Sequence, residues 1–174
     1  MRTTVCVAVG LVLVGCGYAP FTQSLRGPGA LDDQTLQSVQ FYMNDKCIFE
    51  RQVNTVSGEV ARGKLEMREG RAIDVVRVPK HTPGVVEAVW PDKLSVSFAP
   101  GTWFYFGMRA NDGAGSKYYL LGRFDQRTKR FAVSYGGQEY YQTTEDVCYL
   151  EVRRSLQRSK ARDKTTLRGR RIGE

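Results

Sequence analysis

The sequence predicts an all-β protein, either an antiparallel β-barrel or a β-sandwich of about ten short strands, over residues 35–152. Three observations predict this class. Short apolar or alternating runs recur at regular spacing, turn signals rich in Gly, Pro, Asn and Asp separate them, and no amphipathic helical pattern interrupts them. The pairing of the strands cannot be read from these runs, so barrel and sandwich both remain open.

Each predicted strand is bounded by turn signals. The pairs Asn44-Asp45 and Glu69-Gly70 each predict a hairpin between the strands that flank them. Pro91-Asp92, Pro100-Gly101 and Gly136-Gly137 mark further turns. In chain order, the predicted strands are residues 39–43, 46–53, 64–68, 73–78, 85–89, 94–98, 103–108, 117–124, 130–135, 139–143 and 147–152.

The N-terminus has the layout of an export signal, with one positive charge at Arg2, an apolar core over residues 5–14 and a small residue before a cysteine. This apolar stretch is shorter than the roughly 20 residues that a membrane-spanning helix needs. The run Leu13-Val14-Gly15-Cys16 resembles the lipobox of bacterial lipoproteins. The resemblance implies that residues 1–15 are removed and that acyl chains on Cys16 anchor the mature protein. The lack of an aspartate directly after the cysteine favours the outer membrane.

Two cysteines remain once the lipoprotein resemblance is applied. Cys6 leaves with the signal and Cys16 is acylated, so Cys47 and Cys148 are left in an oxidising compartment. We expect these two to form a disulfide that ties the start of the body to its end, with two buried free thiols as the alternative. Closing a loop of that size would stabilise the protein by about 4 to 5 kcal/mol. No Cys/His spacing typical of a metal site is present, and no cofactor is expected.

Two flanking segments complete the predicted organisation. Residues 16–34 are rich in Gly and Pro and predict a flexible tether between the lipidated N-terminus and the body. Residues 153–174 hold nine of the 26 Lys and Arg residues, two acids and no aromatic residue, which predicts a basic tail that is disordered beyond its first few residues, with a short helix around residues 153–162 as the alternative. The body has equal numbers of acidic and basic residues, so apart from Arg2 the net charge of +8 comes from the tail.

Catalysis has few candidates in this sequence. The single histidine, His81, lies in a predicted turn, where an exposed histidine is more often solvated than catalytic. The sequence contains no phosphate-binding loop and no dinucleotide fingerprint. We therefore expect no enzyme activity. A hydrolase that uses a pair of carboxylates remains an alternative, because the spacing of such a pair is set in space and not along the chain.

Aromatic clusters are the first candidate recognition sites. Neighbouring residues on a strand point to opposite faces, so each adjacent pair sends one ring inward and one outward. Outward Tyr and Trp rings are favoured at recognition surfaces, whereas rings that pack inward only fill the core. The candidate ligand-binding or partner-binding residues are Trp103, Tyr105, Tyr118, Tyr119, Tyr140 and Tyr141.

The basic tail is the second candidate recognition site. Cations without interleaved aromatic residues suit a polyanion that is recognised by charge alone, and the alternative is a solvated tail without a ligand. The candidate polyanion-binding residues are Arg153, Arg154, Arg158, Lys160, Arg162, Lys164, Arg168, Arg170 and Arg171. Phosphates and carboxylates of the bacterial envelope fit the expected location, and nucleic acid does not.

Together these features predict a lipid-anchored, non-enzymatic interaction module of the bacterial outer membrane, facing the periplasm or the cell surface. Its β-domain would bind an envelope protein, and its tail would add contact with an anionic envelope polymer. The alternative is a lipoprotein that binds a small ligand or glycan in a cleft lined by the candidate aromatic residues. The body resembles uncharacterised bacterial lipoproteins with a Thr82-Pro83-Gly84 turn and a Lys164-Thr165…Gly169-Arg170-Arg171 ending, which implies no activity.

Overall fold

Two antiparallel sheets build the protein. The computed structural model describes residues 17–27, 31–53, 63–109, 113 and 115–157. One sheet has seven strands in the order β1-β13-β2-β6-β7-β8-β9, and the other has six in the order β10-β11-β12-β3-β5-β4. The all-β prediction is confirmed. The two sheets fit the predicted sandwich. Backbone hydrogen bonds from the Leu120 amide to Cys148 and from the Leu150 amide to Tyr118 also connect β9 to the start of β13.

The seven-stranded sheet contains β1 (Tyr18–Pro20), β2 (Phe41–Met43), β6 (Pro83–Val89), β7 (Lys93–Ala99), β8 (Thr102–Gly107), β9 (Tyr119–Leu120) and β13 (Leu150–Arg153). The six-stranded sheet contains β3 (Cys47–Val53), β4 (Lys64–Arg68), β5 (Arg71–Val78), β10 (Arg123–Asp125), β11 (Arg130–Tyr135) and β12 (Gln138–Gln142). Two short helices, η1 (Gln23–Leu25) and α1 (Asp33–Leu36), lie between β1 and β2. No helix in the described residues is long and apolar enough to cross a membrane.

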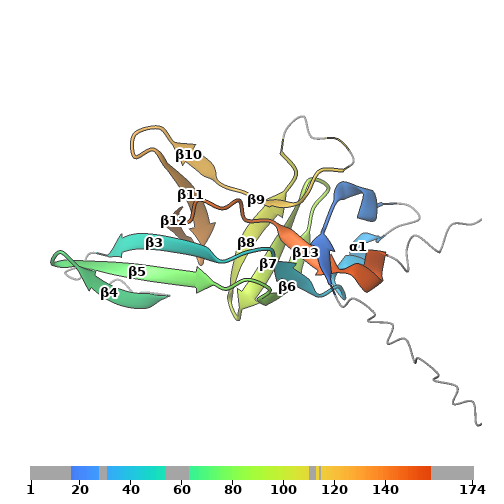
Figure 1. Cartoon of the computed structure of the whole chain (residues 1–174), viewed down its shortest axis with the longest axis horizontal. Coiled ribbons are helices and arrows are strands. Elements are labelled where there is room, and N and C mark those ends of the chain that lie inside the picture. Colours follow the sequence, from blue (N-terminus) through green and yellow to red (C-terminus); the bar gives the residue numbers. More distant parts are fainter. Residues whose placement is uncertain (1–16, 28–30, 54–62, 110–112, 114, 158–174) are drawn as a thin grey trace, which may run out of the picture.

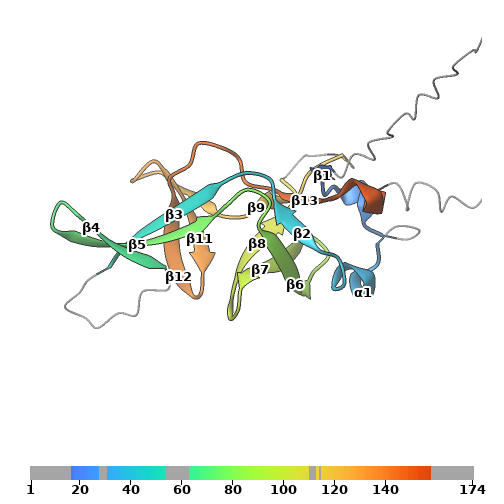
Figure 2. The same cartoon turned by 60° about the horizontal axis from the view of Figure 1, so that its bottom comes forward.

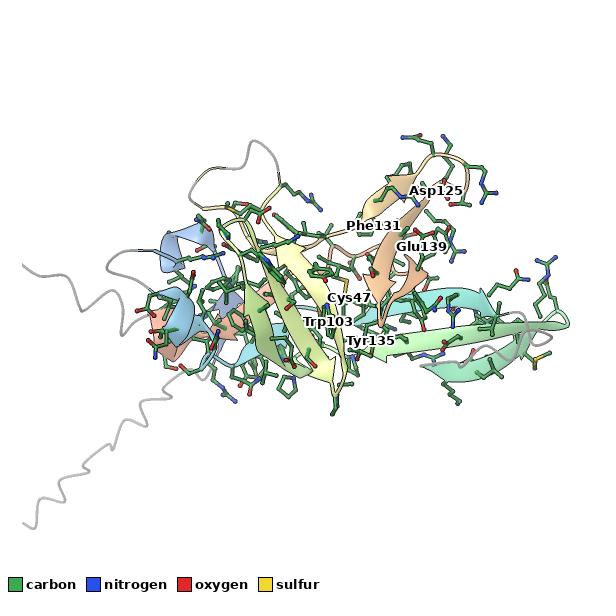
Figure 3. All side chains as sticks on the ribbon, turned by 180° about the vertical axis from the view of Figure 1, so that it is seen from behind. Cys47, Trp103, Asp125, Phe131, Tyr135 and Glu139 are labelled. Atoms are coloured by element: carbon green, nitrogen blue, oxygen red, sulfur yellow. A yellow bond between two sulfur atoms is a disulfide. The ribbon has the colours of Figure 1, made fainter. Side chains whose placement is uncertain are left out.

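Figures 1 and 2 place β1 and β13 at one end of the molecule and the β4–β5 hairpin at the other. The sheets pack together between these ends. Phe104 on β8 lies 4.8 Å from Phe49 on β3 and 4.6 Å from Tyr135 on β11, measured between ring centroids. Figure 3 shows Tyr135 and Cys47 in this central region, where aromatic and aliphatic side chains of both sheets form one core.

The predicted hairpin at Glu69-Gly70 and the predicted turn at Gly136-Gly137 are confirmed. Glu69-Gly70 joins β4 to β5, and both residues have positive φ angles, 49° and 74°. Gly136-Gly137 joins β11 to β12 with φ angles of 57° and 78°. Two-residue turns with positive φ at both positions match the twist of paired strands, which explains why Gly occurs at three of these four positions.

The predicted hairpin at Asn44-Asp45 is wrong. β2 pairs with β13 and β6, whereas β3 pairs with β5 and β12, so this segment carries the chain from one sheet to the other. The described chain passes between the sheets at three more places, residues 79–82, 121–122 and 143–149. The predicted strand 117–124 is split at one of them. At Gly122 a Cβ atom would lie 2.3 Å from the Ala132 carbonyl oxygen, so only glycine lets the backbone pass there unshifted.

The predicted flexible tether over residues 16–34 is also wrong for the residues that the structure describes. β1 pairs with β13 in the register Tyr18↔Arg153, and Phe21 and Leu31 are fully buried in the core. Their apolar side chains close the end of the core beside β13. The free energy gained by burying them outweighs the preference of the surrounding Gly and Pro residues for turns. Cys16 and residues 1–15 lie outside the described residues.

The start of the predicted tail belongs to the folded body as well. Arg153 is the last residue of β13, and residues 154–157 are helical. The Gln157 side-chain amide donates to the Pro20 carbonyl oxygen at 3.1 Å, and Leu156 packs against the core. The other seven candidate cations, from Arg158 to Arg171, lie outside the described residues.

The expected disulfide between Cys47 and Cys148 is present, with a sequence separation of 101 residues. Cys47 follows the first passage between the sheets, and Cys148 lies within the last one. The bond therefore joins the two chain segments that enter and leave the six-stranded sheet.

Replacing Cys47 and Cys148 together by alanine should lower the free energy of unfolding by about 4 to 5 kcal/mol, because the unfolded chain gains the entropy of an open loop of about 100 residues. Urea unfolding of the oxidised protein and the double variant measures this difference. Reduced wild-type protein is the control and should unfold like the variant. Equal unfolding midpoints for the oxidised protein and the variant would contradict the stabilising role.

Candidate functional site

An array of tyrosines and cations covers the side of β1, β2 and β13 that faces away from the core. Leu150 and Val152 of β13 are fully buried, so the alternating residues Glu151 and Arg153 point outward. We call the array the tyrosine–cation face. It consists of Tyr18, Tyr42, Tyr119 and Tyr149 together with Arg109, Lys117 and Arg153.

Arg153 organises one half of the tyrosine–cation face. Its guanidinium carbon lies 5.4 Å from the ring centroid of Tyr18 and 5.5 Å from that of Tyr42, and its Nε donates to the Tyr42 hydroxyl at 3.3 Å. The two tyrosine rings meet edge to face at 4.7 Å. His81 stacks on Tyr18 at 3.9 Å from a backbone position with φ of 57°. The cation is thus held against aromatic faces within the reach of cation–π attraction.

The other half repeats the same contact twice. Lys117 Nζ lies 4.1 Å from the ring centroid of Tyr149, and the Arg109 guanidinium carbon lies 4.2 Å from that of Tyr119. The two tyrosines meet edge to face at 6.2 Å, and their backbones form an isolated antiparallel bridge. An array of this kind presents donors and amphipathic rings together, which suits an anionic or interfacial ligand.

Glu151 lies between the two halves, with its side chain 12% exposed. Burial raises the pKa of its carboxyl, while the charges of His81, Lys80 and Lys117 act in the opposite direction. His81 Nε2 lies 3.5 Å from Glu151 Oε2. The negative charge of Asp45 adds to the rise in the pKa of this recessed carboxyl.

The net charge of this region is positive. The cations are Lys80, Arg109, Lys117, Arg153 and Arg154, and the carboxylates are Asp45 and Glu151 together with Glu145 and Asp146, which are exposed and line the same hollow as Arg109. Asp45 is paired with Lys80 at 3.9 Å, and Glu151 is recessed. The exposed part of the surface therefore offers an excess of N–H donors to an anion.

The predicted alternation of the tyrosine pairs is confirmed. Tyr118 is fully buried and donates to Gln23 Oε1 at 2.6 Å, while Tyr119 points outward into the tyrosine–cation face. Tyr140 is fully buried, while Tyr141 points outward under Arg130 at 4.9 Å. Tyr118 and Tyr140 are therefore core residues and are not available to a ligand.

Of the residues in this face, sequence reasoning predicts Tyr119 and Arg153 and misses three tyrosines and the cations Arg109 and Lys117. Tyr18 lies in the predicted tether, and Tyr149 is no part of an adjacent aromatic pair. The outward position of Tyr42 was visible in the alternation of residues 39–43. Its neighbours could not be predicted, because β2 pairs with a strand about one hundred residues later in the chain.

A separate cleft lies between β8 and the β10–β12 strands, with a volume of about 480 Å³. Of the six aromatic candidates, Tyr105 alone lines it, together with the charged residues Lys93, Arg123 and Glu139. Arg123 and Glu139 form a salt bridge of 2.9 Å at the cleft, and Figure 3 labels Glu139. Trp103 is 41% exposed and does not line this cleft.

A buried polar cluster occupies the six-stranded sheet. Asp74 is fully buried and accepts hydrogen bonds from Tyr140 Oη at 2.8 Å and from the Gly63 amide at 2.7 Å. Arg51 Nη2 lies 3.5 Å from the same carboxylate. Burial and the hydrogen bond to Asp74 raise the pKa of Tyr140 to about 12. A phenol with this pKa stays protonated at neutral pH and donates its proton to the hydrogen bond with Asp74.

No group of three or more potential metal ligands occurs among the residues that the structure describes. The sequence likewise shows no Cys/His spacing of a metal site. The tyrosine–cation face offers positive charge and aromatic surface to a ligand.

Replacing Tyr140 by phenylalanine should lower the stability by about 1 to 2 kcal/mol at neutral pH, because a buried carboxylate loses a donor. It should also remove one source of alkaline destabilisation. The unfolded phenol ionises near pH 10 and the folded one near 12, so this contribution to stability is present below pH 10 and is lost as the pH rises to about 12. Urea unfolding at pH 8 and pH 11 measures both effects. Identical pH dependence in the variant and the wild type would contradict this account.

The comparisons with known proteins assign no family. No family model, no curated protein and no solved structure matches the chain. What the tyrosine–cation face binds must therefore follow from its own chemistry and from its place in the fold.

Proposed function

We propose that this protein is a lipid-anchored component of the bacterial envelope, attached to the outer membrane through Cys16, whose β-domain is a non-enzymatic interaction module. The observation that carries the proposal is the Cys47–Cys148 disulfide at the junction of the two sheets. Structural disulfides persist in oxidising compartments and are rare in the cytosol. Such a bond fits a chain that begins with an export signal and a lipobox.

The start of the folded body supports the same proposal. Gly17, the residue directly after Cys16, accepts a hydrogen bond at its carbonyl oxygen from the Arg154 amide at 2.9 Å. Acyl chains on Cys16 would therefore hold the folded domain itself at the membrane. Two or more chains give stable anchoring, whereas one chain gives marginal binding.

The outer face of β6–β8 supports binding to an envelope protein. Val85 on β6 and Trp103 on β8 both point away from the core and are exposed, at 50% and 41%. Trp is enriched among residues that dominate the energy of protein interfaces. This face lies on the same outer side of the seven-stranded sheet as the tyrosine–cation face and adjoins it where Tyr42 on β2 pairs with Pro83 on β6.

The second candidate function is the binding of a small ligand or glycan. The cleft beside Tyr105 favours it, because about 480 Å³ is within the usual size range of ligand sites. The charged lining and the single aromatic wall make this the weaker proposal.

The test is photocrosslinking in the native envelope, with a photoreactive residue in place of Trp103. We expect one defined protein adduct that persists in a chain ending at residue 157, because that truncation keeps Leu156 and Gln157, which pack against the body. The matched control carries the photoreactive residue at Met67, which is 67% exposed on β4, and should not give this adduct.

Three results would contradict parts of the proposal. If neither position captures a defined protein, the interaction module fails and the cleft becomes the site to examine. If only the full chain gives an adduct and salt abolishes it, the binding element is the basic tail. If the Cys16→Ser variant still incorporates labelled fatty acid and stays in the membrane fraction, the anchor is not Cys16. The Cys6→Ser variant is the control, and it should remain labelled.

A further inference from the structure

We infer that the tyrosine–cation face is a membrane-contacting surface that binds the headgroup phosphates of anionic phospholipids beside the lipid anchor. The inference rests on the proposed acylation of Cys16. It adds what acylation alone does not give, namely which surface of the domain lies against the membrane and which groups contact the lipid.

The position of Tyr18 is the first argument. Only Gly17 separates Tyr18 from Cys16, and two extended residues span at most about 7 Å. Tyr18 is fixed in β1 by its pairing with Arg153, and Gly17 is held by the Arg154 amide. An anchored Cys16 would therefore bring the Tyr18 ring, and the side of the sheet that it covers, to the depth of the lipid headgroups.

The chemistry of the face is the second argument. Tyrosine has an apolar ring and a polar hydroxyl, and it is enriched at membrane–water interfaces for that reason. The guanidinium groups of Arg153 and Arg109 lie over tyrosine rings, where their N–H groups can form paired hydrogen bonds with phosphate oxygens. Four half-buried tyrosines with three such cations combine both features on one surface.

Charge is the third argument. Five cations of this region stand against four carboxylates, and of these Glu145 and Asp146 are exposed beside Arg109. Asp45 is paired with Lys80, and Glu151 is recessed beneath its neighbours. Cationic side chains near an anionic leaflet are attracted to it over about one Debye length, so an excess of cations next to the anchor favours this orientation.

The far end of the folded chain adds to the same surface. Gln157 is bonded to Pro20 in β1, so residue 158 follows at the end of the molecule where Gly17 lies. Seven of the nine cations of the basic tail come after this point. The β4–β5 hairpin lies at the opposite end of the molecule from this last described residue (Figure 1).

The experiment uses the intact protein with its own anchor, reconstituted in vesicles of phosphatidylcholine and phosphatidylglycerol. A photoreactive residue replaces Tyr42 in the tyrosine–cation face, and a matched variant carries it at Tyr105 on β8. We expect lipid adducts at position 42 to exceed those at position 105 by about fivefold or more. The excess should fall in vesicles of phosphatidylcholine alone.

Charge-reversal variants connect the adducts to the cations. Arg153→Glu and Lys117→Glu should each lower the yield at position 42 by about fivefold. Arg109 lies outside the strands, so Arg109→Glu tests the same effect on the adduct yield if Arg153→Glu does not fold. Glu139→Arg, at the cleft, should leave the yield unchanged.

Two results would overturn the inference. Equal lipid adducts at positions 42 and 105 would do so, and so would a protein adduct in place of lipid when position 42 is tested in the native envelope. Intact-mass measurement separates this failure from that of the proposed function. A chain without acyl groups on Cys16 refutes the anchor, whereas an acylated chain with equal adducts refutes the orientation alone.

Discussion

The structure depends on how one asparagine holds the junction between the two sheets. Asn44 Nδ2 donates to the Val147 carbonyl oxygen at 3.0 Å, and its Oδ1 accepts from the Tyr149 amide at 2.7 Å. The Asn44 amide also donates to the Tyr149 carbonyl oxygen at 3.1 Å. The Cys47–Cys148 bond locks the same two segments covalently. The side chain thus replaces backbone pairing at the point where the chain leaves one sheet for the other.

The tyrosine–cation face follows from this junction. Once Tyr149 is fixed by Asn44, the alternation of β13 sets Glu151 and Arg153 on the outer side. β1 then pairs along β13 and adds Tyr18, while β2 pairs on its other edge and adds Tyr42. The face therefore combines residues from both ends of the chain. A folded body that starts at Gly17, in place of a tether, brings this face next to any anchor on Cys16.

The sequence predicts those features that depend on neighbouring residues. It does not predict the features that depend on pairing between distant strands. Turns such as Glu69-Gly70 and the inward and outward members of the tyrosine pairs depend on neighbouring residues, and both were predicted. Asn44-Asp45 has the composition of a hairpin turn, yet the Asn44 side chain bonds a segment about one hundred residues away. Phe21 and Leu31 lie among Gly and Pro residues, and only the completed core shows that they are buried. Tyr18 and Tyr149 joined the site for the same reason.

Native-state hydrogen exchange at the Tyr149 amide tests the junction most directly. If Asn44 holds the crossing, this amide exchanges slowly in the oxidised protein, and Asn44→Ala raises its rate by about tenfold, which corresponds to the loss of one buried hydrogen bond. Amides in the β4–β5 hairpin, far from the junction, should change only as much as global stability does. Rapid exchange of Tyr149 in the wild type, or an unchanged rate in the variant, would contradict the central role of Asn44.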